Sequence, residues 1–249
     1  MLNVIEHGAS GRPLVIAHGL FGSGRNWGVI AKRLSATRRV ICVDMRNHAG
    51  SFWSDEMTYE AMASDLTEVL EPLGDADLLG HSMGGKASMM AALQGAPMRR
   101  LIVADIAPVT YTHTQTPLID AMEAIDIRSV ATRGEADAAL AAEVEDPGIR
   151  AFLLQSLDIK AKAWKLNLAA LRANMDAIIG FPEVAGSFEK PAFFLSGATS
   201  DYVQPEARPV IKTLFPKARF AKLNGAGHWL HAEKPREFEA AVAAFLDAP

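Results

Sequence analysis

The sequence has 249 residues, of which 49% are hydrophobic and 22% charged, with a formal net charge of −4 at pH 7. This composition is typical of a globular protein with one sizeable α/β domain, and the charge gives no basis for nucleic acid or an anionic membrane as a partner. No apolar run could span a bilayer, and the stretch MLNVIEHGAS lacks the pattern of a secretory signal. Cys42 is the single cysteine, so no intrachain disulfide can form, and the sequence predicts a cytoplasmic protein.

Short apolar runs rich in Val, Ile and Leu alternate with segments of helical periodicity. The runs lie at residues 13–19, 39–45, 77–82 and 100–107 and, after an interruption, at 191–197 and 218–225. They lack polar–apolar alternation, as strands buried on both faces do. Apolar residues recur at three- and four-residue intervals in 26–36, 57–73 and 237–248, as in amphipathic helices. This order predicts a parallel sheet with helices on both faces, with 2–8 as an antiparallel edge strand.

The alternation breaks after Pro108 and resumes at Pro191. Helical patterns occur between them, at 117–127, 135–146, 149–157 and 164–179. We interpret 109–188 as an all-helical cap inserted in an α/β core of 1–108 and 189–249. So long an insertion exceeds what a crossover needs, which favours a lid over a site at the carboxyl ends of the strands. Its apolar side chains, Phe152 and Trp164 among them, suit an apolar acyl pocket, although packing of the cap would explain most of them.

A serine lies between two glycines where the run 77–82 ends, in the pattern Gly80-His81-Ser82-Met83-Gly84. The pattern G-x-S-x-G often occurs by chance, but a strand before it and a helix after it are the context of a nucleophile elbow. Small neighbours allow the strained backbone of a tight strand-to-helix turn. The turn also places the hydroxyl at a helix N-terminus, which favours developing negative charge.

A nucleophilic serine needs a base, and His228 in GAGHWLHAEKP is the best candidate. Its flanking glycines allow a loop that aims the imidazole inward, whereas the rival His231 follows three residues later. A lone loop histidine is otherwise a surface residue. His228 and His231 with Glu233 also have the composition of a metal site, but the ordinary structural reading of these residues is far stronger.

An oxyanion hole needs two N–H donors. The Met83 amide, directly after the nucleophile, is the first. The loop HGLFGSGRNW provides the second, for which we favour Leu20, with Phe21 as the alternative. We also place Phe21 and Trp229 in the substrate pocket. The loop has neither a Walker lysine nor a G-x-G-x-x-G pattern, so phosphate binding is disfavoured.

The acid of a triad orients the histidine and stabilises its charged form. Asp105 ends the run 100–107, and Asp201 follows the run 191–197. Both positions suit the acid and both also suit a structural aspartate that caps a loop or helix. Spacing alone does not choose between them.

These residues together resemble the α/β-hydrolase superfamily, and more narrowly the small YbfF-type bacterial esterases and their mitochondrial abhydrolase relatives. The resemblance rests on HGLFGSGRNWG, VDMRNHAGS, GHSMGGKA, DIAPV and GAGHWLHAEKP, which span nearly the whole chain outside the insertion. It implies an eight-stranded core sheet with a helical cap, and a serine hydrolase of esters or thioesters. In this subgroup the aspartate of D-I-A-P is taken as the triad acid, which favours Asp105. The acid position of many other superfamily members is Ser200 here, with Asp201 displaced by one, and Ala49 stands where glycine is usual.

Three further polar residues lie within the motifs. We interpret Asp44 and Arg46 as ties between loops. Lys86 lies one turn after Ser82, and its charge must be paired or reach solvent. A nearby carboxylate is its expected partner, with an acidic group of the substrate as the alternative.

The sequence therefore predicts a serine hydrolase acting on a small-molecule acyl ester or thioester, without metal or organic cofactor. Ser82 argues against dehalogenases and epoxide hydrolases on this fold, which carry an aspartate at the elbow. Carbon–carbon bond hydrolases and lyases keep the same triad, and small-molecule receptors without activity share the fold. These two classes remain the alternatives, because fold alone does not decide chemistry.

Overall fold

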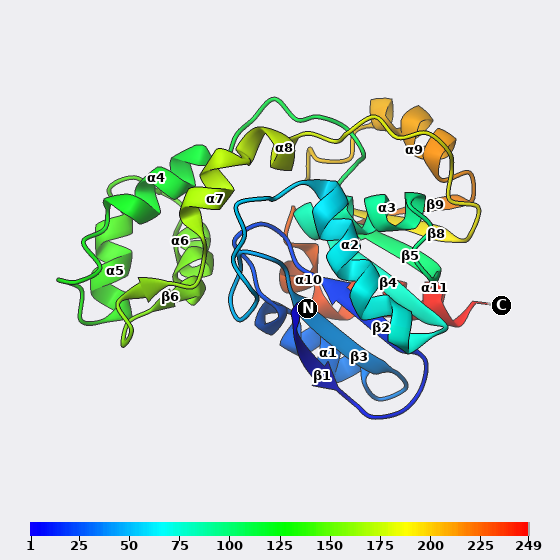
Figure 1. The fold of residues 1–249 in the computed structure, drawn as a ribbon, viewed down its shortest axis with the longest axis horizontal. Helices are drawn as coiled ribbons and strands as arrows, with labels where there is room; N and C mark the ends of the chain where they lie inside the picture. Colours follow the sequence, from blue (N-terminus) through cyan, green and yellow to red (C-terminus); the bar gives the residue numbers. More distant parts are fainter. Residues whose placement is uncertain (249) are drawn as a thin grey trace.

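A seven-stranded sheet forms the centre of the molecule (Figure 1). The computed structural model describes residues 1–248. In sheet order the strands are β1 (Asn3–His7), β3 (Arg39–Asp44), β2 (Pro13–Ala17), β4 (Ala76–His81), β5 (Met98–Ala104), β8 (Ala192–Gly197) and β9 (Ala218–Leu223). β1 runs antiparallel to β3, and every other neighbouring pair is parallel. The predicted mostly parallel sheet with an antiparallel first strand is confirmed.

Helices cover both faces of this sheet. On one face lie α1 (Gly28–Leu34), α10 (Leu230–Glu233) and α11 (Pro235–Asp247). On the other lie α2 (Tyr59–Leu70), α3 (Met83–Leu93) and α9 (Arg208–Leu214). All six residues of β4 are buried, which explains why its sequence shows no alternation. Among residues 1–248, no helix combines the length and the apolar character needed to cross a bilayer, and the cytoplasmic location stays a prediction.

The chain between β5 and β8 leaves the sheet and forms a separate layer of short helices (Figure 1). These are α4 (Thr116–Ala124), α5 (Arg133–Leu140), α6 (Pro147–Leu153), α7 (Leu168–Ala173) and α8 (Met175–Ile179). Their buried apolar side chains belong to the same cluster as those of α2 and α3. We call this segment the cap, and its predicted bounds of 109–188 stay a prediction.

Two expectations about the architecture are wrong. The cap is not all-helical, because β6 (Leu157–Asp158) and β7 (Ala163–Trp164) form an antiparallel hairpin. Strands of two residues carry no hydrophobic period that a sequence pattern could reveal. The core sheet has seven strands within residues 1–248 rather than eight. The eighth strand came from the resemblance alone, whereas the six apolar runs and the predicted edge strand at 2–8 account for all seven strands.

Candidate active site

Ser82 lies on a sharp turn between β4 and α3. Its backbone has φ 52° and ψ −122°, a strained conformation for a residue with a side chain. A Cβ atom on Gly80 would collide with the Gly84 carbonyl, and one on Gly84 would collide with the carbonyls of β2 and His18. The two glycines are therefore required by the close approach of backbones at this turn. The turn has the strand-to-helix geometry of a nucleophile elbow.

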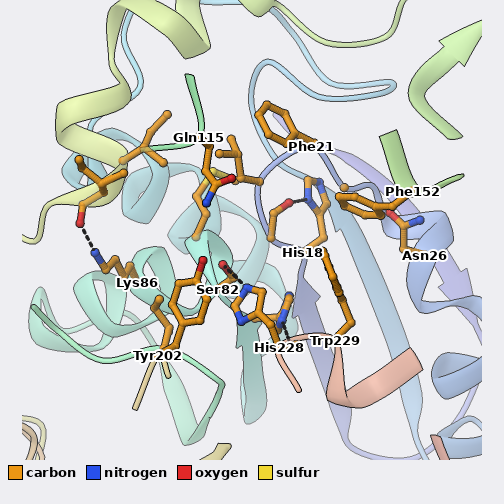
Figure 2. A pocket seen from close by; sticks show the side chains of 18 of the residues that line it. His18, Phe21, Asn26, Ser82, Lys86, Gln115, Phe152, Tyr202, His228 and Trp229 are labelled. Atoms are coloured by element: carbon orange, nitrogen blue, oxygen red, sulfur yellow. Dashed lines mark hydrogen bonds between the residues drawn. The ribbon is translucent and has the colours of Figure 1, made fainter. Parts of the chain in front are cut away.

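The imidazole of His228 lies between Ser82 and the buried carboxylate of Asp105, and Figure 2 shows its contact with Ser82. His228 Nε2 is 3.1 Å from Ser82 Oγ, and Nδ1 is 2.8 Å from Asp105 Oδ2. The carboxylate can only accept, so Nδ1 carries the proton and Nε2 is free to accept the serine proton. The Tyr202 ring stacks on the imidazole with centroids 4.0 Å apart. The structure thus brings together the predicted serine, the predicted base and one of the two predicted acids.

Asp105 is completely buried, and its charge is compensated by several donors. Oδ1 accepts from the Gly197 amide at 2.9 Å, and Oδ2 accepts from the Ser200 hydroxyl as well as from His228. Asp201 is exposed, and its side chain accepts a bond only from Gln204 among the described residues. The other predicted acid is therefore not brought to His228. Ser200 stands beside Asp105, a role that the sequence did not reveal.

Two side chains fix the loop that carries His228. Glu233 accepts from the Gly227 amide at 2.7 Å and from the Trp229 amide at 3.2 Å. The His81 imidazole lies 2.9 Å, through Nε2, from the carbonyl of His228, which makes Nε2–H the donor. Burial holds the pKa of His81 well below its ordinary value, so this ring is a neutral donor. The Glu233 carboxylate thus holds the backbone of this loop on both sides of His228.

The amides of Met83 and Leu20, the predicted oxyanion donors, are free of protein acceptors among the described residues, unlike the amide of Phe21. The Met83 amide opens α3, where no intrahelical acceptor exists. The Leu20 amide follows β2, and no acceptor within residues 1–248 binds it. The Phe21 amide, in contrast, donates to His48 Nε2 at 3.2 Å. The geometry therefore favours Leu20 over Phe21.

A cavity of about 270 Å³ opens above Ser82, between the core and the cap. Phe21, Phe152 and Trp229 form part of its wall, as predicted for a pocket (Figure 2). Ile178 and Ile179 of the cap are also on the wall. Trp164 is not, because it lies in the cap hairpin, where its indole N–H donates to the Met122 carbonyl. The lining is mostly apolar, which suits the hydrocarbon part of a small organic ligand.

Lys86 is buried, with 1% of its surface exposed, and it has no carboxylate within 4.0 Å among the described residues. Its Nζ donates to the carbonyls of Ile179 at 2.8 Å and Gly180 at 2.6 Å, at the end of α8. It also lies 4.6 Å from the centre of the Tyr111 ring. The prediction that Lys86 pairs with a nearby carboxylate is wrong. The actual partners are backbone carbonyls, which a sequence pattern cannot indicate.

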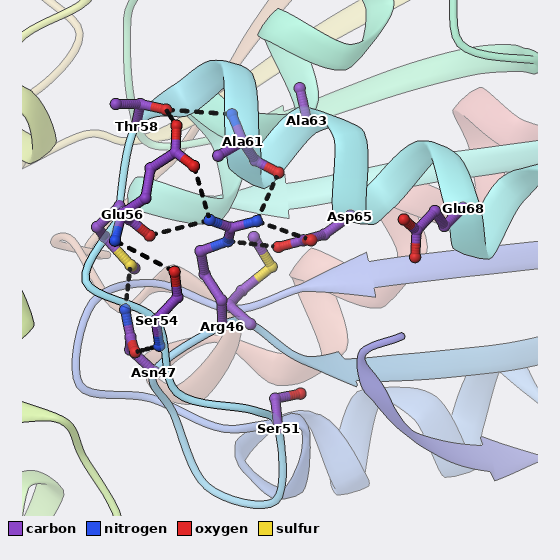
Figure 3. Close-up of polar contacts among 12 residues, drawn as sticks. Arg46, Asn47, Ser51, Ser54, Glu56, Thr58, Ala61, Ala63, Asp65 and Glu68 are labelled. Carbon is purple, nitrogen blue, oxygen red and sulfur yellow. Dashed lines mark hydrogen bonds and ion pairs between the residues drawn. The ribbon is translucent and has the colours of Figure 1, made fainter.

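Arg46 and Asp44 bind several loops, as the sequence suggested, and Figure 3 shows the contacts of Arg46. The Arg46 guanidinium forms a bidentate pair with Asp65 of α2, with distances of 2.6 and 2.9 Å, and donates to two backbone carbonyls. Asp44 accepts from the amides of Gly24 and Gly50 at 2.7 and 3.0 Å. Ala49, which directly precedes Gly50, has φ 46°, in the region that glycine adopts freely.

Comparison with known proteins gives a consistent result. The model of the Alpha/beta hydrolase family matches residues 14–241. The chain belongs to the α/β-hydrolase family. It is 40% identical to the mouse sn-1-specific diacylglycerol lipase ABHD11 over 98% of this chain and 84% of the relative, and 37% identical to Esterase YbfF of Escherichia coli over 94% and 93%. A solved structure of a marine microorganism esterase is 38% identical, with a TM-score of 0.93 and 98% of both chains covered.

Family membership confirms the expected α/β-hydrolase fold, the resemblance to YbfF-type esterases and abhydrolase relatives, and the expectation of a hydrolytic enzyme. The relatives named above are called esterases or lipases.

Proposed function

We propose that this α/β-hydrolase cleaves carboxylic esters or acyl thioesters through an acyl-enzyme on Ser82. The observation that carries the proposal is the chain of two hydrogen bonds from Ser82 through His228 to the buried Asp105, at the floor of a mostly apolar cavity. The names of the relatives, a diacylglycerol lipase and esterases, support the ester class.

The reaction has two halves, each with the same groups. Ser82 Oγ attacks the acyl carbonyl carbon while His228 Nε2 takes the serine proton, and Asp105 stabilises the imidazolium that forms. The negative oxygen of the tetrahedral intermediate accepts from the Leu20 and Met83 amides. The bond to the leaving oxygen or sulfur breaks, and the leaving group receives the proton from His228. Water then gives one proton to His228 and attacks the acyl carbon; the bond between this carbon and Ser82 Oγ breaks, His228 returns the proton to Oγ, and the acid is released.

The side chains around the triad suit this sequence of steps. Asp105 is buried, and two donors besides His228 hold its carboxylate in place beside the imidazolium as it forms. The left-handed turn at Ser82 places the nucleophile before the first amides of α3, where negative charge is favoured. In the proposed reaction, the serine hydroxyl, the imidazole and the carboxylate of the triad carry out the acyl transfer.

The test is covalent labelling followed by a substrate panel. We expect a fluorophosphonate probe to modify the wild-type protein at Ser82 and to leave Ser82→Ala unlabelled. Acyl p-nitrophenyl esters and acyl-CoA thioesters of increasing chain length would then separate ester from thioester activity. A folded protein that the probe does not label would contradict the proposal and favour a receptor. A labelled protein that cleaves neither substrate class would instead favour a carbon–carbon hydrolase or lyase.

A further inference from the structure

The loop that carries Leu20 has an unusual backbone. The Gly22 amide donates to the Gly19 carbonyl at 3.0 Å and closes a tight turn over residues 19–22. Within this turn Phe21 has φ 63°, in the left-handed region that residues with side chains seldom adopt. Such a conformation persists only where the surroundings hold it. The contacts of Phe21 therefore decide where the neighbouring Leu20 amide points.

The imidazole of His48 binds the backbone amide of Phe21. A backbone N–H can only donate, so His48 Nε2 accepts this bond of 3.2 Å. The proton of the ring is then on Nδ1, which donates to the Arg46 carbonyl at 2.8 Å. His48 is completely buried, and burial lowers its pKa to about 3. The ring therefore stays neutral, and Nε2 stays an acceptor across the pH range in which an esterase is assayed.

Two further contacts hold the same loop. The His18 ring, whose centroid is 5.0 Å from that of His48, donates from Nδ1 to the Gly19 carbonyl at 2.8 Å. A trans peptide is planar, so the Leu20 N–H points away from this carbonyl. From the cap, the Ser156 hydroxyl donates to the Phe21 carbonyl at 3.0 Å. The peptide groups on both sides of Leu20 are thus tied down, while its own N–H has no protein acceptor within residues 1–248.

We propose that His48 is a positioning residue for the oxyanion hole: by binding the Phe21 amide it keeps Phe21 left-handed and aims the Leu20 amide at the cavity beside Ser82. The catalytic consequence rests on the proposed function. The positioning itself is a property of the loop, whatever the reaction is.

Two substitutions of His48 distinguish the proposed hydrogen bond to the Phe21 amide from a role in packing alone. His48→Asn keeps a donor near Nδ1 for the Arg46 carbonyl but has no acceptor at the place of Nε2. His48→Gln is long enough to put its amide oxygen there and to accept from Phe21. We expect kcat for p-nitrophenyl butyrate to fall roughly 10- to 100-fold in His48→Asn, with KM within about twofold, because a displaced oxyanion donor weakens only the transition state. We expect His48→Gln to recover most of kcat, and the control variant His7→Gln, at a half-buried position on the edge strand β1, to match wild type.

The result that would overturn the proposal is equal kcat in the Asn and Gln variants, or a loss confined to KM. NMR of the wild-type protein gives a test that needs neither activity nor a variant. Long-range ¹H–¹⁵N spectra should show the His48 proton on Nδ1 down to about pH 5, and the Phe21 amide should be protected from hydrogen exchange. A proton on Nε2, or a rapidly exchanging Phe21 amide, would refute the role of His48. Absent ester hydrolysis by wild type would refute the proposed function alone.

Discussion

Lys86 provides a quantitative test of the structure, because its ammonium group is buried without a counter-charge. Burial lowers the pKa of Lys86 from its ordinary value of 10.5 to about 7. Between these two values the unfolded chain holds the proton more tightly than the folded protein does. The free energy of unfolding should therefore rise with pH across this interval and level off above the unfolded pKa.

The size of the effect follows from the shift. At about 1.36 kcal/mol for each pKa unit, the Lys86 contribution changes by about 2.5 kcal/mol between about pH 7.5 and 9.5. The bonds to the Ile179 and Gly180 carbonyls, at the negative end of α8, favour the charged form and oppose the shift. We therefore treat this figure as an upper bound and expect about 1.5 kcal/mol.

Urea unfolding at several pH values measures this directly. Lys86→Met fills the same space without a titrating group, so the free energy of unfolding of wild type minus that of Lys86→Met should rise with pH. Other groups titrate in both proteins and cancel. Lys217, which is exposed, serves as the matched control, and Lys217→Met should show no such trend. A difference between wild type and Lys86→Met that stays flat from about pH 7.5 to 9.5 would refute the reasoning.

Three further predictions concern the triad and its loops. Asp105→Asn should lower kcat for p-nitrophenyl butyrate by roughly 10³- to 10⁴-fold, whereas Asp201→Asn should stay within about twofold; the reverse order would make Asp201 the acid. Ser200→Ala removes one donor to Asp105 and should lower kcat about tenfold with KM unchanged, and a change in KM alone would contradict its contact with the acid. Ala49→Gly should relieve the left-handed backbone and raise the free energy of unfolding by about 0.5 kcal/mol in urea titrations, while a loss of stability would contradict it.

Features encoded over short stretches were readable from the sequence. The elbow at Ser82 needs only its two glycines, a strand before it and a helix after it, and these lie within one stretch of the chain. The buried strands were visible because parallel strands covered on both faces are continuously apolar. The glycine-flanked loop of His228 also pointed to its place at the end of the sheet.

Features that depend on distant backbone were not readable. Lys86 binds carbonyls 93 and 94 residues away, and every residue has a carbonyl, so no pattern could name these partners. Ser200 binds Asp105 across 95 residues, so this contact depends on the fold that brings the ends of two strands together. His48 lies within the motif VDMRNHAGS. Its proposed positioning role depends on the left-handed backbone of Phe21, which cannot be predicted from the sequence.

The histidines around the site differ in burial and in their distance from a carboxylate. Burial lowers the pKa of His48 and of His231 to about 3, and it also holds those of His18 and His81 below the ordinary value. Burial disfavours the charged form of each of these rings, and none of them lies within 4.0 Å of a carboxylate among the described residues; at His18, Asp44 opposes the effect of burial only in part. His231 stacks on Trp27, and its Nδ1 has no hydrogen-bond partner within the described chain. His228 is the one histidine of residues 1–248 that lies within 4.0 Å of a carboxylate, and its Nε2 also lies 3.1 Å from Ser82 Oγ, as the proposed base requires. These contacts support the proposal of His228 rather than His231 as the base, a choice that the sequence based on flanking glycines.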